Sequence, residues 1–129
     1  MIQKMFVERN FYTRDQIHDQ LGGEKQTYLP MLDGKVVCVC LTKEDNPKAP
    51  EVVLVGGEGK TIVKRAEILS NQVNSIPVFM KDCSNSWRCE GYYVADGYKT
   101  DAATIQKEIM GSGRTGVVAG ILYLKKVIN

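Results

Sequence analysis

The chain has 129 residues, 43% of them hydrophobic and 25% charged, which is the composition of one soluble globular domain that can bury a core. With 17 basic and 15 acidic residues its formal net charge is +2, which excludes a strongly basic arm that coats nucleic acid by charge alone. No run approaches the roughly 18 apolar residues of a membrane span, and residues 1–9 lack a signal-peptide core. We therefore expect a cytoplasmic protein with no membrane partner, in which residues 1–10 are a lead-in and residues 11–127 form a single domain.

The first predicted element is a helix that begins after Thr13-Arg14-Asp15-Gln16. This is a capping box, in which the threonine side chain accepts a hydrogen bond from the third-residue amide and the glutamine reaches back. The helix is expected to run to Leu21 and to end at Gly22-Gly23. It contains His18, the one histidine of the chain, for which both a structural role and a ligand or catalytic role stay open.

Asp33-Gly34 predicts a tight turn that leads into a strand over Lys35–Leu41. The strand is apolar on both faces, so we expect it to be central in a sheet, with Tyr28 and Pro30 on the neighbouring segment. The prolines and charges of residues 42–50 cannot continue a ladder and predict a surface loop.

A further strand is predicted over Glu51–Gly56, followed by the glycine-rich stretch Gly56–Thr61. This stretch is similar to a phosphate-binding P-loop but fails the motif, because G-x-x-x-x-G-K-[ST] requires glycine where Leu54 stands. Apolar residues at helical spacing then predict a helix from Thr61 to about Gln72.

Ile76–Tyr93 predicts two strands joined by a polar turn, and we expect the rest of the sheet to be organised around them. Strict alternation after the turn places four residues on one face. These are Trp87, Cys89, Gly91 and Tyr93. A lone tryptophan favours a core anchor, whereas the donors near it favour a nucleic-acid pocket.

Val94–Tyr98 predicts a turn or strand end, and Thr100 or Asp101 then caps a short helix over Ala102–Met110. Val117–Val127 is expected to be a last, well-buried strand. Five or six strands, about three helices and hairpin signals predict an α+β fold. Its sheet is expected to be curved and mostly antiparallel, or a partial barrel, flanked by the helices.

The four cysteines are spaced C-x-C and C-x₅-C, which matches neither a zinc ribbon nor a secreted disulfide framework. We interpret them as reduced, small hydrophobic residues. A four-thiolate metal site is conceivable because Cys38 and Cys40 share a strand face, but the C-x₂-C spacing of such sites is missing. No cofactor is expected.

Several short signatures follow one another in an order that resembles a known family. They are Tyr12–His18, Leu21-Gly22-Gly23, Tyr28-Leu29-Pro30, Gly34–Cys38, Asn46–Glu51, Ile76–Phe79 and Asn85–Tyr93. Together they resemble the SRA-like domain of McrA-type, modification-dependent restriction endonucleases, over roughly residues 11–126. The resemblance implies a PUA-like pseudo-barrel that inspects modified bases in DNA, most readily modified cytosine, with base flipping as one route. It also implies a restriction or counter-defence context.

Two features depart from that pattern. The His-Asn-His nuclease that usually accompanies such a domain needs several histidines, and this chain has only His18. The tyrosine-aspartate-glycine signature of the methylcytosine-reading branch is absent, since Ala95-Asp96-Gly97 does not match it. We therefore expect a non-enzymatic module that binds modified double-stranded DNA, with a separate nuclease or effector as a further partner.

Aromatic rings and amides suit contacts with a base, and cations suit contacts with phosphate. The expected base-binding residues are Tyr28, Asn46, Asn85, Trp87 and Tyr93. The expected phosphate-binding residues are Lys43, Lys48, Lys81 and Arg88. For each lysine a solvated surface charge is the alternative.

Two other functions stay open. An RNA-binding or partner-binding module can be built on the same fold, because a fold does not fix a function. A small metal-dependent nuclease is the other, since Asp33-Gly34-Lys35 fits half of a nuclease motif, although the turn alone explains Asp33-Gly34.

Overall fold

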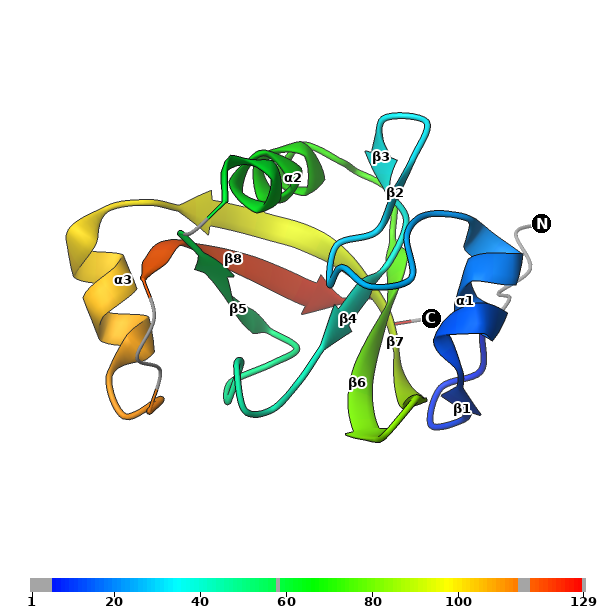
Figure 1. Cartoon of the computed structure of the whole chain (residues 1–129). Coiled ribbons are helices and arrows are strands. Elements are labelled where there is room, and N and C mark those ends of the chain that lie inside the picture. The colour runs from blue at the N-terminus through cyan, green and yellow to red at the C-terminus, as the bar shows by residue number, and fades with distance from the viewer. Residues whose placement is uncertain (1–5, 58, 114–116, 129) are drawn as a thin grey trace.

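The computed structural model describes residues 6–57, 59–113 and 117–128 of the chain (Figure 1). The helices are α1 (Arg14–Leu21), α2 (Lys60–Ser70) and α3 (Ala102–Ile109). The strands are β1 (Phe11–Tyr12), β2 (Met31–Leu32), β3 (Lys35–Val36), β4 (Val39–Leu41), β5 (Val52–Gly56), β6 (Ile76–Cys83), β7 (Ser86–Lys99) and β8 (Val118–Lys126).

Six of these strands form one sheet in the order β4-β6-β7-β8-β5, with β1 added to β7. Among the described residues β4–β6 is the one parallel pair, and the other pairs of the sheet are antiparallel. The two end strands, β4 and β5, do not pair with each other, so the sheet is open. Figure 1 shows α2 lying across the sheet, with α1 and α3 at opposite ends. The prediction of an α+β fold with a mostly antiparallel sheet and three helices is confirmed.

The predicted continuous, central strand Lys35–Leu41 is wrong. β3 pairs only with β2 around the Asp33-Gly34 turn, in a separate two-stranded sheet. The amide of Val37 donates to the carbonyl of Pro30 (2.9 Å), which continues this hairpin and keeps Val37 out of the six-stranded sheet. β4 then lies at one end of the sheet. It is apolar on both faces because Val39 and Leu41 pack in one core cluster and Cys40 in the other. The segment before β2 covers its free edge, where the Cys40 amide donates to the Tyr28 carbonyl (2.9 Å).

β7 is paired along its length with β6, β8 and β1, and a bulge near its middle changes which residues share a face. Val78 pairs with Gly91 and Phe79 pairs with Cys89, so Glu90 is an extra residue on β7. An extra residue breaks the period-two alternation of a strand. The prediction that Trp87 and Tyr93 share one face is therefore wrong, and the two rings lie in different core clusters.

The predicted turn or strand end at Val94–Tyr98 is a second bulge within β7. Ala95 pairs with Leu124 and Tyr98 with Leu122, so Asp96 and Gly97 together face a single residue of β8. Gly97 has φ 121, a conformation that glycine adopts without strain. The Asp-Gly signal thus marks a bend in a continuing strand.

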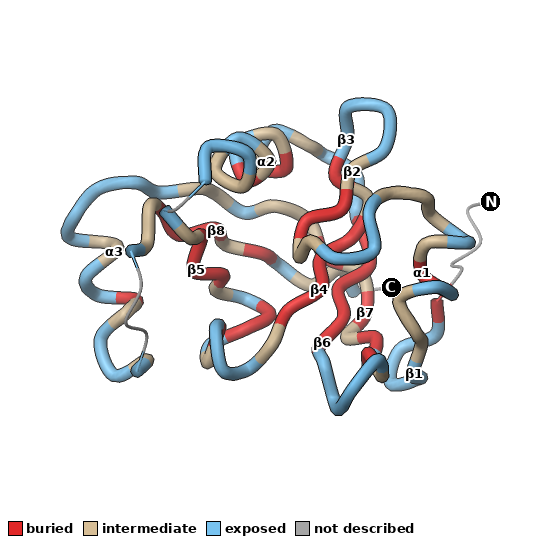
Figure 2. The backbone as a smooth tube through the Cα atoms, viewed as in Figure 1, coloured by how far each residue is buried: buried red, intermediate tan, exposed pale blue. Residues whose placement is uncertain are grey.

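The core has two parts, and the buried residues run through the middle of β4, β5, β6 and β8 in Figure 2. The first core lies between the sheet and α2 and includes Val53, Val55, Leu69, Ile76, Val78, Tyr93 and Leu122. The second core lies against α1 and contains Phe6, Ile17, Cys38, Cys40, Phe79, Trp87 and Cys89. Phe6 packs edge-to-face on Phe79, with ring centroids 5.0 Å apart. Residues before Phe11 therefore contribute to the core.

The predicted helix signals at α1 and α3 are confirmed. The Thr13 hydroxyl accepts from the Gln16 amide (3.1 Å), and the Gln16 side chain accepts from the Thr13 amide (2.8 Å). Asp101 is the residue that caps α3. The last predicted strand is β8, one residue shorter at each end than expected. No helix in the described part of the chain is long and apolar enough to cross a membrane.

A carboxylate holds α3 in place. Glu108 is the buried residue of α3, and it accepts from the Tyr123 hydroxyl of β8 (2.6 Å) and from Lys48 Nζ of the loop after β4 (3.0 Å). The hydrogen bond from Tyr123 and the charge of Lys48 hold the pKa of Glu108 below its usual range. The same hydrogen bond raises the pKa of Tyr123 to about 12. One side chain therefore links α3, β8 and the loop between β4 and β5.

Replacing Trp87 by alanine is expected to lower the free energy of unfolding by about 3–5 kcal/mol, because it empties a large space in the second core. Trp87→Phe, which keeps an aromatic ring there, is expected to lower it less. Urea denaturation followed by circular dichroism measures both changes. An unchanged midpoint for Trp87→Ala would show that this ring does not support the core.

Tyr123→Phe is expected to lower the free energy of unfolding by about 1–3 kcal/mol at neutral pH, since Glu108 loses one of two partners. A carboxyl whose pKa is lowered in the folded state stabilises the fold above its unfolded pKa and loses that contribution as the pH falls. The difference between wild type and variant should therefore shrink as the pH falls below the ordinary glutamate value of 4.5. Urea titrations across this pH range measure it.

Tyr98→Phe is the matched control for that variant. The Tyr98 hydroxyl is buried and has no hydrogen-bond partner among the described residues, so its removal should leave the stability unchanged or slightly higher. An equal loss in both variants would show that the hydrogen bond to Glu108 contributes nothing.

Candidate functional site

Arg14, the first residue of α1, connects several of the predicted site residues. Its guanidinium carbon lies 5.1 Å from the centroid of the Trp87 ring. Its backbone amide donates to the side chain of Asn85 (3.1 Å), and its Nη2 donates to the carbonyl of Thr27 (2.8 Å), the residue before Tyr28. We call this group the Arg14 corner: Arg14, Thr27, Lys81, Asn85 and Trp87.

Lys81 completes the corner. Its Nζ lies 5.9 Å from the centroid of the Trp87 ring, and the residue itself is exposed. Two cations against one indole ring are a favourable arrangement, because the face of the ring carries partial negative charge. Trp87 is only 8% exposed, and its Nε1 has no hydrogen-bond partner among the described residues. The ring therefore supports the cations more than it offers a free stacking surface.

The loop between α1 and β2 borders the corner and is fixed by a second arginine. Arg65 of α2 donates to the carbonyl of Leu29 (3.0 Å) and forms an ion pair with Glu24. The hydrogen bond from Arg65 lowers the pKa of Glu24 to about 2, so Glu24 stays ionised. The loop borders a shallow, open depression of about 570 Å³. Its lining is Glu24, Lys25, Gln26 and Thr27.

The two predicted tyrosines do not join this corner through their side chains. Tyr93 is buried in the first core, where burial raises its pKa to about 12. Tyr28 is half-buried and packs against the same core. A base cannot stack on Tyr93 in this conformation, whereas the backbone of Tyr28 adjoins the depression.

Asn46 and Lys43 fold the loop between β4 and β5 onto itself. Asn46 is buried, and its side-chain oxygen accepts from the amide of Leu54 (2.8 Å). Lys43 Nζ donates to the carbonyls of Pro47 (3.3 Å) and Ala49 (3.4 Å). Both side chains are thus engaged in holding the loop in shape.

This loop, which also contains Lys48, has an acidic environment. Against the two lysines stand four carboxylates, which belong to Glu44, Asp45, Glu51 and Glu108. An excess of negative charge disfavours a nearby phosphate. The structure therefore gives Lys43 and Lys48 internal partners and a poor setting for DNA backbone contacts.

Arg88, the last predicted phosphate contact, lies next to Trp87 on β7. Its Nε donates to Glu90 Oε2 (2.7 Å), and its side chain is 50% exposed. It lines a depression of about 440 Å³ together with residues of the N-terminal segment. All four predicted cations are exposed, and two of them, Lys81 and Arg88, lie near the β6–β7 turn, away from the acidic loop.

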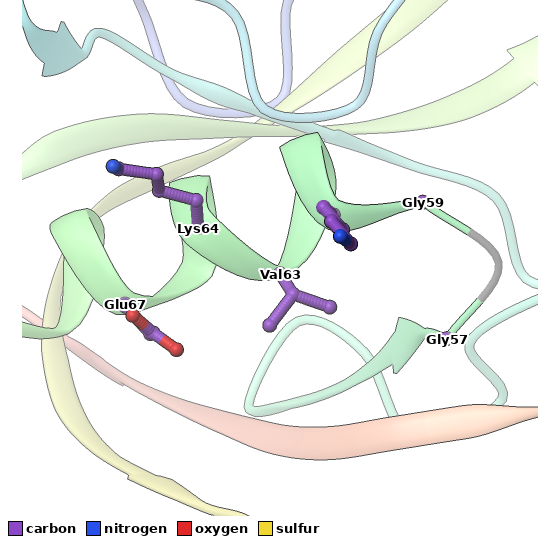
Figure 3. Close-up of a pocket in the computed structure, with 6 residues that line it drawn as sticks. Gly57, Gly59, Val63, Lys64 and Glu67 are labelled. Atoms are coloured by element: carbon purple, nitrogen blue, oxygen red, sulfur yellow. The ribbon is translucent and has the colours of Figure 1, made fainter.

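The glycine-rich stretch before α2 forms a further cavity of about 270 Å³. Figure 3 shows Val63 and Glu67 pointing to one side of α2 and Lys64 to another. Gly59 caps the helix without a side-chain hydrogen bond. Lys64 therefore points away from Val63 and Glu67, which agrees with the failed P-loop motif.

The other chemical candidates have structural explanations. Within the described residues no group of three or more His, Cys, Asp or Glu side chains lies close enough to hold a metal ion. Cys38 and Cys40 are buried with their Sγ atoms 4.0 Å apart, and all four cysteines are free. His18 Nδ1 lies 2.6 Å from the carbonyl of Gly23, at the end of α1. Asp33 occupies the β2–β3 turn with φ 52.

Sequence reasoning missed Arg14. The capping box fixes it as the first residue of α1, but its partner Asn85 is 71 positions away. A local sequence pattern cannot predict a contact between residues so far apart in the chain.

Comparisons with known proteins identify the fold. No protein-family model matches the sequence, and no curated protein matches it. The crystal structure of the SUVH5 SRA domain in complex with hemi-methylated CG DNA is similar, with a TM-score of 0.64 and 13% sequence identity. The match covers 100% of this chain and 93% of that chain. The chain therefore has an SRA-like fold, as the resemblance predicted, and the narrower likeness to McrA-type domains stays a prediction.

Proposed function

We propose that the chain binds double-stranded DNA that carries a modified base. The observation that carries this proposal is the SRA-like backbone along the whole chain, similar to a domain solved with hemi-methylated DNA. Modified cytosine as the base, base flipping and a restriction or counter-defence context belong to the same proposal and derive from the sequence resemblance. Cleavage, where it follows, is left to a separate nuclease or effector.

The Arg14 corner supports a division of roles within such a site. Lys81 is exposed beside a buried ring, so it is suited to a backbone phosphate. The depression over residues 24–27 is linked to the corner through Arg14, which donates to the Thr27 carbonyl, and its lining includes Gln26, whose amide group can donate to and accept from a base edge. Arg14 holds these two parts together and is a positioning residue.

Few phosphates can be neutralised in this arrangement. Lys43 and Lys48 are engaged in the acidic loop, which leaves Lys81 and Arg88 of the predicted set. Each neutralised phosphate contributes about −0.9 to the slope of log affinity against log salt concentration. Binding should thus depend on salt only weakly, and the preference for a modified base should come from contacts with the base.

Titration against matched duplexes with cytosine, methylcytosine, hydroxymethylcytosine or glucosylated cytosine tests the proposal. We expect tighter binding to at least one modified duplex and a salt slope of about −2 to −3, which corresponds to two or three neutralised phosphates. Lys81→Ala should weaken binding to all duplexes alike and flatten the slope by about one. Equal affinity for all four duplexes, or tighter binding to a competing RNA, would contradict a reader of modified DNA.

We also propose that the chain does not cleave DNA. Asp33 is explained by its turn, and the described residues hold no metal-binding group. Methylated and unmodified plasmids incubated with Mg²⁺ or Mn²⁺ should both stay intact. Nicking that Asp33→Ala abolishes would overturn this expectation and revive the nuclease alternative.

A further inference from the structure

A second depression, on the other side of β7 from the Trp87 side chain, is built by the N-terminal segment. Its volume is about 440 Å³. Its lining is Glu8, Arg9, Phe11, Arg88, Cys89, Glu90 and Lys126. β1 fixes it to the sheet, because Phe11 pairs with Arg88 in the β1–β7 register.

The backbone at Arg9 is held in an unfavourable conformation. The Asn10 amide donates to the Val7 carbonyl (3.1 Å), which closes a turn, and the Arg9 amide donates to the Cys89 carbonyl (2.8 Å). Arg9 has φ 76, where a side chain other than glycine is strained. The other described non-glycine residues with positive φ are Asp33 and Asn85, whose residue types tolerate it. An arginine at such a strained position points to a use for its side chain.

The charges around the depression are arranged in pairs, except for Arg9. Arg88 is paired with Glu90 (2.7 Å), and Lys126 is paired with Glu8 (2.7 Å). The second pair crosses over Gly91, where a Cβ atom would lie 3.0 Å from Lys126 Cε. Arg9 forms no ion pair within the described residues and is exposed. Three cations and two carboxylates leave one positive charge in excess, on the strained residue.

An aromatic ring lies beside these cations. Phe11 is 52% exposed, although it is large and apolar, and its neighbour Arg88 keeps donors beyond the Nε that binds Glu90. A guanidinium fork matches two phosphate oxygens, and an exposed ring can pack against a sugar or base. This combination fits a nucleotide better than a simple anion.

We propose that this depression binds a backbone phosphate of duplex DNA, with Arg9 as the main contact, Arg88 as the second, and Phe11 against the adjacent sugar. The inference rests on the proposed function and extends it. Trp87 and Arg88 are consecutive on β7, so their side chains point to opposite faces of the sheet. The depression is therefore a contact surface separate from the Arg14 corner.

Arg9→Gly tests the inference without damaging the backbone, because glycine adopts a positive φ freely. We expect an unchanged or higher melting temperature. Affinity should fall about tenfold for modified and unmodified duplexes alike. The salt slope should flatten by about one, while the ratio between the duplexes stays constant. Arg9→Lys should recover part of the affinity.

Lys107→Ala is the control, since Lys107 is an exposed cation on α3, at the opposite end of the sheet (Figure 1). It should change neither affinity nor slope. If wild type binds modified DNA and Arg9→Gly binds equally well, the inference is overturned and the proposed function stands. If wild type binds no duplex, both fall. A changed ratio between the duplexes would make Arg9 a base contact and overturn the phosphate assignment.

Vesicles of phosphatidylcholine and phosphatidylserine test the other common source of phosphate. Wild type should not sediment with them. Sedimentation that Arg9→Gly abolishes, without any change in DNA affinity, would assign the depression to a lipid headgroup and overturn the inference.

Discussion

The bulge at Glu90 is the constraint on which the rest of the structure depends. β7 pairs with three strands, and a single extra residue between Cys89 and Gly91 changes the face to which the following side chains belong. The strand can therefore contribute Trp87 and Cys89 to the core under α1, and Tyr93 to the core under α2. Without the bulge Trp87 and Tyr93 would lie on the same face of β7. One long strand thus contributes to two hydrophobic cores, one under α2 and one under α1. The second core supports the loop between α1 and β2.

In the loop-rich part of the molecule, arginine side chains donate to backbone carbonyls that no β-ladder partner occupies. The loop between α1 and β2 has little regular structure, and its carbonyls at Thr27 and Leu29 accept from Arg14 and Arg65. Hydrogen bonds to a charged donor are stronger than those between neutral groups, so two arginine side chains can hold this loop together with its one backbone hydrogen bond to β4. The same Arg14 lies against the Trp87 ring. Because Trp87 belongs to the second core, the shape of the depression over residues 24–27 depends on the packing of that core through Arg14.

The sequence predicted those features that a few neighbouring residues determine. The Thr13 capping box, the Asp33-Gly34 turn and the helix over Lys60–Ser70 needed no knowledge of distant partners. The failures involved pairing. A bulge exists only as a mismatch between two strands, and the split of Lys35–Leu41 arises because Pro30 takes an amide hydrogen bond from Val37. In the candidate site, Lys81 and Asn85 were grouped with Trp87 by local sequence, whereas Arg14 and Arg9 reach β7 only through the fold.

The placement of charge is compatible with the proposed binding of nucleic acid by a nearly neutral chain. Glu108 of α3 forms an ion pair with Lys48, so the charge of Lys48 is compensated within the protein. Around β1 and the β6–β7 turn, Arg9 and Lys81 form no ion pair within the described residues. Exposed charges act over about 10 Å at moderate salt, so local excess matters more than the sum over the chain. In the proposed complex, a net charge of +2 would therefore limit the number of phosphates that the protein neutralises, but not the position of those contacts on its surface.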